Sequence, residues 1–260
     1  MEPIYTPASV DVAYQLRWSL SLFAQAELPP IETWLPQVKP LVEPDGVRIL
    51  ACRVMSDSTW QFYLSTRPVV NPSAIVKSVK GRLQHLIRST VPQAFRRNFL
   101  LAAVGDARRE VVEQYVASQL GHHRMSDPRV QETLKKFQLQ FDDVDLAANQ
   151  FTAHGAYLYN LHLVLVHDGR WPLIRDEDFS RSRDMVRAVA KKYGHRLSRL
   201  AMLSDHLHLV AGVPPSSSPQ DVALRYLNNL AYAHGMTALY SQSYYVGTVG
   251  EFDSGAIRRV

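Results

Sequence analysis

Four segments from the first half of this 260-residue chain reappear, in the same order, in its second half. The offset between matching segments stays between about 143 and 148 positions, which coincidence seldom produces. Each match is weak by itself, but the four together predict two copies of one domain. The paired segments are AYQLRWSLSLF with AYLYNLHLVLV, VMSDSTWQFYL with MLSDHLHLVAG, NPSAIVKSVKGRL with SPQDVALRYLNNL, and FLLAAVGDARREVVEQY with YYVGTVGEFDSGAIRRV.

Each copy shows strand patterns alternating with helix patterns. In the second copy Ala156–Val166 is a β-rich run, and Arg181–Tyr193 carries an apolar stripe at helical spacing before Gly194. Leu197–Val213 returns to strand, and Asp221–Ala233 is a second helix. We therefore predict an α+β fold in which each copy is an antiparallel sheet with helices on one face. The predicted boundaries are 1–120 for the first copy, 121–155 for a linker with some helix, and 156–260 for the second copy.

The composition sets broad limits on the class of protein. A formal net charge of +5 and a pI near 9.3 permit a polyanionic partner, although a solvated basic surface explains them equally well. The single cysteine, Cys52, excludes an intramolecular disulfide and fits a reducing compartment. The amino-terminal segment does not resemble a signal peptide, and no run of about 18 apolar residues occurs. We expect a soluble, cytoplasmic protein with no membrane span.

The two copies differ at a pair of histidines. The second copy holds His206 and His208 within SDHLHLV, two positions apart in an apolar run. The alignment of the copies places Ser58 and Trp60 at these positions, so the first copy has no histidine pair.

The terminal helix shows the opposite loss. The first copy holds Tyr115 and Gln119 in YVASQ, four residues apart and therefore on one helical face. In the second copy the alignment places Val260, the last residue of this sequence, opposite Tyr115. The losses are complementary, so a site assembled between the copies would keep every residue.

These motifs resemble the single-tyrosine HUH transposases, the TnpA-type enzymes of small insertion sequences. The matching stretches are SDHLHLV for the HUH signature, QSYYVGTVG for the segment before the tyrosine helix, and YVASQ for that helix. The resemblance covers Ala156–Val260 and, more faintly, Ala13–Gln119. It implies two small ferredoxin-like or RRM-like domains fused in tandem, so that a monomeric chain acts as an internal dimer. It also implies single-stranded, hairpin-forming DNA as the partner.

The resemblance further implies one composite active site. Tyr115 would attack phosphorus, giving a 5′-phosphotyrosine intermediate and a free 3′-hydroxyl. His206 and His208 share one side of a strand and, with the amide oxygen of Gln119, would suit Mg²⁺ or Mn²⁺. The metal would polarise the scissile phosphate.

Structural roles compete with this interpretation. A His-x-His pair on a strand is by itself more often structural, a helical tyrosine is usually a core residue, and a solvated glutamine would also explain Gln119. Tyr244 and Tyr245 are rival nucleophiles that we interpret as core residues. His122 and His123 follow Gln119 closely enough to approach a metal, or belong to a flexible linker.

Basic residues recur at helical spacing in both copies and predict contacts with DNA phosphates. Exposed helix faces are often rich in lysine and arginine, so a purely solvated face is the alternative. The candidates are Lys77, Lys80, Arg82 and Arg88 in the first copy, and Arg183, Arg187 and Lys191 in the second.

The function predicted from the sequence is a single-stranded DNA transposase or endonuclease that cuts and rejoins DNA with a divalent metal. The alternative is a catalytically inactive, domesticated descendant of a transposase that binds DNA or RNA. One nucleophilic tyrosine per chain leaves open whether Tyr115 acts in succession, whether a second chain joins, or whether the protein only nicks.

Overall fold

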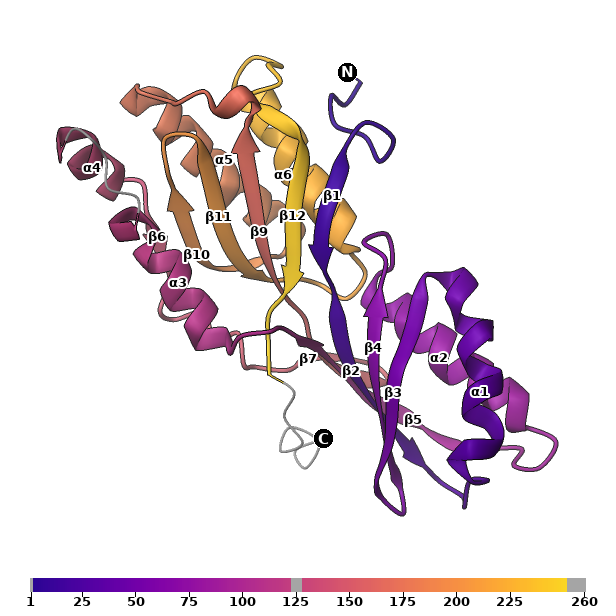
Figure 1. The fold of residues 1–260 in the computed structure, drawn as a ribbon. Helices are drawn as coiled ribbons and strands as arrows, with labels where there is room; N and C mark the ends of the chain where they lie inside the picture. Colours follow the sequence, from indigo (N-terminus) through magenta and orange to yellow (C-terminus); the bar gives the residue numbers. More distant parts are fainter. Residues whose placement is uncertain (1, 123–127, 252–260) are drawn as a thin grey trace.

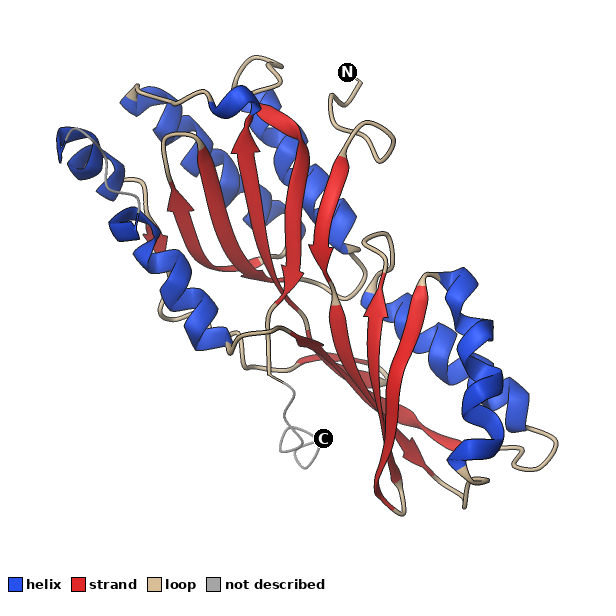
Figure 2. Ribbon diagram, in the orientation of Figure 1, coloured by secondary structure: helices blue, strands red, loops and turns tan. Residues whose placement is uncertain are grey.

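The computed structural model describes residues 2–122 and 128–251. Within these residues the fold is mixed α+β, with two six-stranded sheets side by side in an elongated molecule (Figure 1). Helices cover one face of each sheet (Figure 2). The α+β class predicted from the sequence is confirmed. None of the helices in the described ranges is long and apolar enough to cross a membrane.

The first sheet has the strand order β3-β4-β2-β5-β8-β7 and is covered on one face by helices α1 and α2. Short 3₁₀ turn η1 (Glu43–Asp45) follows α1. The elements are β2 (Arg17–Ala24), α1 (Ile31–Val42), β3 (Val47–Ser56), β4 (Thr59–Thr66), α2 (Pro72–Ile87), β5 (Phe95–Val104), β7 (Gln150–Thr152) and β8 (Gly155–Leu158).

The second sheet has the order β1-β12-β9-β11-β10-β6 and is covered on one face by helices α5 and α6. Short 3₁₀ turn η2 (Asp168–Arg170) follows β9. The elements are β1 (Asp11–Gln15), β6 (Leu139–Gln140), β9 (Asn160–His167), α5 (Asp176–Tyr193), β10 (Arg196–Met202), β11 (His206–Gly212), α6 (Pro219–Ala233) and β12 (Tyr240–Thr248).

The two halves share one order of elements. Strand, helix, two strands, helix and strand follow each other from β2 to β5 and again from β9 to β12. The four strands also lie in the same spatial order, β3-β4-β2-β5 in one sheet and β10-β11-β9-β12 in the other, with antiparallel neighbours.

Helix ends follow local sequence signals. Asn71 caps α2 by accepting a hydrogen bond from the backbone N–H of Ala74. Ser218 and Asp221 form a capping box at the start of α6. Gly194 ends α5 in the left-handed conformation, as its position in the sequence predicts. These caps fix where each helix leaves its sheet.

The halves interlock by exchanging strands. β1 leads into β2 but pairs in parallel with β12 of the other half, and β8 leads into β9 but pairs in parallel with β5. At the two crossover points the rings of Trp18 and Tyr159 lie 5.2 Å apart, and both residues are fully buried. One continuous apolar core therefore runs through both halves.

Two glycines allow the chain segments to cross after β5 and β12. The N–H of Gly105 donates to the carbonyl of Gly250 over 2.8 Å. A Cβ atom at Gly105 would lie 2.7 Å from the carbonyl oxygen of Thr248, and one at Gly250 would lie 2.2 Å from that of Ala103. Backbone approaches this close exclude any side chain.

Beyond the crossing, α3 (Arg109–His122) leaves the first half and packs on β10 and β11 of the second sheet. It lies on the face opposite α5 and α6 (Figure 1). Val116 is fully buried there against Ala201, Leu203 and Val210. The predicted linker contributes α4 (Pro128–Lys135), β6 at the edge of the second sheet, and β7 at the edge of the first.

Candidate active site

The histidine pair occupies the first and third residues of β11. His206 and His208 point to one face of the second sheet, with ring centroids 5.1 Å apart, and each is 6% exposed. Leu207 and Leu209 point to the other face and join the core beneath α5 and α6. The period-two alternation of a strand produces this arrangement, as the sequence predicts.

Helix α3 brings Tyr115 onto the same face. Its ring centroid lies 5.9 Å from that of His208 in an edge-to-face arrangement, and 6.5 Å from that of His122. Tyr115 is 47% exposed, whereas its neighbour Val116 is fully buried. The phenol therefore lies beside the histidines and remains accessible to a large substrate.

Asp205 orients the first histidine. Its Oδ1 lies 2.6 Å from Nδ1 of His206, and its Oδ2 accepts a hydrogen bond from Arg170. Burial favours a higher pKa for Asp205, but the hydrogen bonds from His206 and Arg170 outweigh it and lower the pKa. The carboxylate thus favours a proton on Nδ1 of His206, which leaves Nε2 as the ring nitrogen that could bind a metal.

A third histidine, His162 on β9, contacts the second one. Its Nε2 lies 3.1 Å from Nδ1 of His208, and the two rings stack with centroids 5.3 Å apart. Burial lowers the pKa of His162 to about 4, so its ring is neutral at physiological pH. The ring of Tyr115 lies 6.3 Å away.

His162 is not among the residues predicted from the motifs, although the sequence carries a signal for it. In NLHLVLVH the histidine alternates with Leu161, Leu163 and Leu165, which face the core. A polar residue out of phase with the core-facing leucines has to lie on the opposite face of the strand. That face is the one that carries His208.

Gln119 lies one helical turn after Tyr115. It is 1% exposed, and its Nε2 donates to the carbonyl oxygen of Tyr115 over 3.2 Å. The amide oxygen is the atom that a hard cation would take. Across the described ranges, no group of three or more His, Cys, Asp or Glu side chains could hold a metal ion.

The register of the sheets corrects one alignment from the sequence. Trp60 faces the helix-covered core, as Leu207 does, so His206 and His208 correspond to Thr59 and Gln61 rather than to Ser58 and Trp60. A shift of one residue moves every side chain of a strand to the other face. The first half still has no histidine pair at this place.

The two rival tyrosines on β12 face opposite ways. Tyr244 is buried in the core, as predicted, and burial raises its pKa to about 12. Tyr245 is only partly buried and lies on the site face, with its ring 5.8 Å from that of His162, so its assignment to the core is wrong. Strand alternation places neighbours on opposite faces. His123 and Val260 lie outside the described residues.

The predicted DNA-binding residues are not brought to this site. They lie on or beside α2 and α5, which pack on the helix-covered faces of the sheets. The ammonium group of Lys80 donates to two backbone carbonyls, and Arg82 pairs with Asp45. Arg183 pairs with Asp184. Exposed side chains remain at Lys77, Arg88, Arg187 and Lys191.

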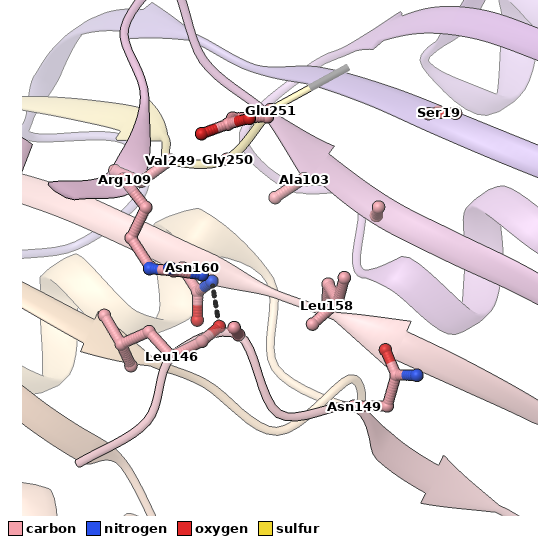
Figure 3. Close-up of a pocket in the computed structure, with 12 residues that line it drawn as sticks. Ser19, Ala103, Arg109, Leu146, Asn149, Leu158, Asn160, Val249, Gly250 and Glu251 are labelled. Carbon is pink, nitrogen blue, oxygen red and sulfur yellow. Dashed lines mark hydrogen bonds between the residues drawn. The ribbon is translucent and has the colours of Figure 1, made fainter. Parts of the chain in front are cut away.

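A separate pocket of about 240 Å³ lies where the two halves meet (Figure 3). Arg109, Asn160 and Glu251 line it, and Nδ2 of Asn160 donates to the carbonyl oxygen of Leu146 over 2.9 Å. Neither Tyr115 nor the three histidines are among its lining residues, so this pocket is distinct from the candidate active site.

The family described as Transposase IS200 like matches residues 156–259, the part of the chain that contains β9 to β12 and all three site histidines. Residues 156–259 resemble an IS200-like transposase. The match suggests a transposase function and makes DNA the expected partner. Tyr115 and Gln119 lie outside the matched range. Among curated proteins no match is found.

Solved structures show only distant similarity. A candidate transposase from Deinococcus radiodurans R1 is 18% identical, with a TM-score of 0.32, over 41% of this chain and 92% of that protein. A candidate glycine cleavage system transcriptional repressor is 11% identical (TM-score 0.24, covering 91% and 98%). A protein of unknown function from Galdieria sulphuraria is 9% identical (TM-score 0.22, covering 90% and 97%). Similarities this low establish no shared fold.

Proposed function

We propose that this chain cuts and rejoins single-stranded DNA through a covalent bond to Tyr115, at one site shared by its two halves. The observation that carries the proposal is the 5.9 Å separation between the rings of Tyr115 and His208. The tyrosine follows β5 of the first sheet, whereas the histidine belongs to β11 of the second. The nucleophile and the imidazoles therefore meet only because α3 crosses between the halves.

The proposal treats the chain as an internal dimer of two ferredoxin-like HUH copies, residues 1–120 and 156–260, joined by residues 121–155. The shared order of elements and strands supports this interpretation. The exchange of β1 and β8 between the sheets supports it as well, because each half extends the other in the same way.

In the proposed reaction, the phenolic oxygen of Tyr115 attacks the scissile phosphorus and loses its proton to solvent. The bond between phosphorus and the 3′ oxygen breaks, and that oxygen leaves as a hydroxyl after taking a proton. The 5′ phosphate stays on Tyr115. Rejoining reverses the step, because a 3′-hydroxyl attacks the phosphotyrosine and releases the phenol.

A divalent cation, Mg²⁺ or Mn²⁺, would be held by His206, His208 and the amide oxygen of Gln119, and would polarise the phosphate. The contact between Asp205 and Nδ1 of His206 supports this donor set, since metal-binding histidines usually donate their other N–H to a carboxylate. For His208 the corresponding contact is to His162.

The proposed DNA substrate is single-stranded with hairpin-forming ends. Phosphates of the hairpin would contact the basic residues of α2 and α5, of which Lys77, Arg187 and Lys191 have exposed side chains. These residues remain proposed contacts.

The test is a covalent adduct assay. The purified chain is incubated with Mn²⁺ and a panel of single-stranded hairpin DNAs, and adducts are resolved on a denaturing gel. We expect an adduct that disappears in Tyr115→Phe, in His208→Ala and on chelation with EDTA. Tyr245→Phe, on the same face, is the matched control and should retain the adduct.

If Tyr245→Phe abolishes the adduct and Tyr115→Phe does not, the nucleophile is misassigned. If no DNA gives an adduct while binding persists, the chain is a nucleic-acid-binding descendant of a transposase.

A further inference from the structure

The first sheet has a second polar face, opposite the one that α1 and α2 cover. Strand register shows which side chains share it, because paired residues on neighbouring strands point the same way. Ser65 of β4 pairs with Arg17 of β2 and with Arg48 of β3, while Gln61 of β4 pairs with Arg53 of β3. This face corresponds to the one that holds the candidate active site in the second sheet.

Two adjoining hollows mark this face and share Arg17 between them. One is lined by Arg53, Gln61 and Tyr63, together with Asp106. The other is lined by Tyr14, Arg48, Ser65 and Arg67, together with Glu43. They adjoin across β2, β3 and β4 and form a tract that we call the arginine face, defined by Arg17, Arg48, Arg53, Gln61, Tyr63 and Arg67.

The charge on the arginine face is mostly uncompensated. Asp106 forms an ion pair with Arg17. The side chains of Arg48, Arg53 and Arg67 are exposed and make no hydrogen bond or ion pair with any residue in the described ranges. Exposed guanidinium groups without a protein partner are suited to bind phosphate, because their paired N–H donors match the spacing of the phosphate oxygens.

A buried polar atom in the first hollow also indicates a ligand. Gln61 is 2% exposed, and its Nε2 donates to the hydroxyl of Ser19 over 2.9 Å. Its Oε1 is buried and has no hydrogen-bond partner among the described residues. A buried acceptor without a partner is costly, and the amino or imino group of a nucleobase is a donor that could satisfy it.

Aromatic side chains flank the arginines. Tyr14 is 49% exposed and lines the second hollow, and Tyr63 is partly exposed in the first. Single-stranded nucleic acids bind to faces that combine basic groups for the backbone with aromatic rings on which bases stack.

We infer that the arginine face binds unpaired DNA, so that the half without histidines serves as a second DNA-binding surface. The choice of DNA rests on the proposed function. Arg48 and Arg53 pair with Ser65 and Gln61, which are four residues apart on β4 and therefore about 13 Å apart at the rise of a strand, so the face spans more than one phosphate.

The test measures binding of fluorescein-labelled oligothymidine, which forms no hairpin, to the full chain by fluorescence anisotropy in EDTA. We expect Arg48→Glu with Arg53→Glu to weaken binding by about tenfold or more. The magnitude of the slope of log affinity against log salt concentration should fall by about 1.4. Each phosphate contact to a single strand contributes about 0.7 to this slope, and the variant loses two contacts. Thermal unfolding checks that this double variant remains folded.

The matched control is Arg175→Glu with Lys192→Glu, which changes the net charge equally at two exposed positions at the ends of α5 that are not among the proposed DNA contacts, and it should bind as the unmodified chain does. Photocrosslinking to 5-iodouracil-substituted oligonucleotide should attach at Tyr63 or Tyr14. The inference is wrong if the arginine variant binds normally, if the control variant loses as much affinity, or if crosslinks map only to α2 and α5.

This binding assay is independent of the adduct assay. Loss of binding in the arginine variant without any Tyr115 adduct would overturn the proposed cleavage and leave the arginine face as a binding surface. An adduct at Tyr115 together with normal oligothymidine binding by the arginine variant would support the proposed cleavage and overturn the arginine face as a binding surface.

Discussion

At the scale of single residues, the candidate site depends on how each side chain is held. Tyr115 is nearly half exposed on a helix that is anchored by buried Val116 and Gln119, so its phenol can move toward a substrate without disturbing the packing. The histidines are almost fully buried, and His206 is oriented through Nδ1 by Asp205. A reactive group is left accessible while its supporting groups are fixed, which is the usual arrangement of a preorganised site.

The contact between His162 and His208 leads to a prediction about metal requirement. Because His162 holds Nδ1 of His208, His162→Ala should raise the Mn²⁺ concentration for half-maximal adduct formation by about 10- to 100-fold. His162→Asn, which retains a donor and an acceptor, should have a smaller effect. A merely structural role would lower stability in both variants and leave the Mn²⁺ dependence unchanged.

At the scale of elements, strand periodicity decides which residues can act together. Alternation on β9 and β11 places all three histidines on one face, while the leucines between them anchor the sheet to α5 and α6. On β4 the same alternation places Trp60 in the core and Gln61 on the opposite face. Repeat matching alone misaligned this strand by one residue, because the connections before it differ in length between the halves.

The connection between α5 and β10 leads to a prediction about pH. His195 is buried there with its Nδ1 3.0 Å from the hydroxyl of Tyr226, and burial, with a smaller effect of Arg225, lowers its pKa from 6.5 to about 4. The unfolded chain therefore binds more protons than the folded chain between pH 6.5 and 4. Stability should fall as the pH falls through this window.

The check on this prediction is urea unfolding measured at several pH values between 7 and 4. His195→Asn should show a shallower fall than the unmodified chain, although a slope should remain because His162 is also held neutral by burial. Equal slopes in the two proteins would show that His195 does not stay neutral in the folded state.

At the scale of the whole molecule, the two halves depend on each other. Each sheet takes a strand from the other half, and α3 completes the candidate site across the boundary. Separate halves would each expose an unpaired strand edge and an apolar surface, so neither is expected to fold as it does in the full chain. The interlocking also explains how one site can draw residues from positions 115 and 206.

The crossing of the two chain segments leads to a prediction about stability. Gly250→Ala would bring a Cβ atom within 2.2 Å of the carbonyl oxygen of Ala103, so it should destabilise the protein by about 1–3 kcal/mol. Gly81→Ala is the matched control in α2, where a Cβ atom meets nothing within 4 Å, and it should stabilise by about 0.5–1 kcal/mol. Denaturant unfolding measures both, and equal stabilities would contradict the crossing.

The sequence by itself determined that strands and helices alternate, that Gly194 ends α5, and that His206 and His208 point away from the core-facing leucines of β11. These properties depend on residues close together in the chain, so local spacing reveals them. Only the tertiary structure decided that α3 lies on the second sheet, that His162 joins the pair on β11, and that the arginines of β2 and β3 share one face. Such contacts depend on strand pairing and on the crossing at Gly105 and Gly250, where backbone segments about 145 residues apart in the chain meet. No local pattern in the sequence specifies a contact between segments so far apart.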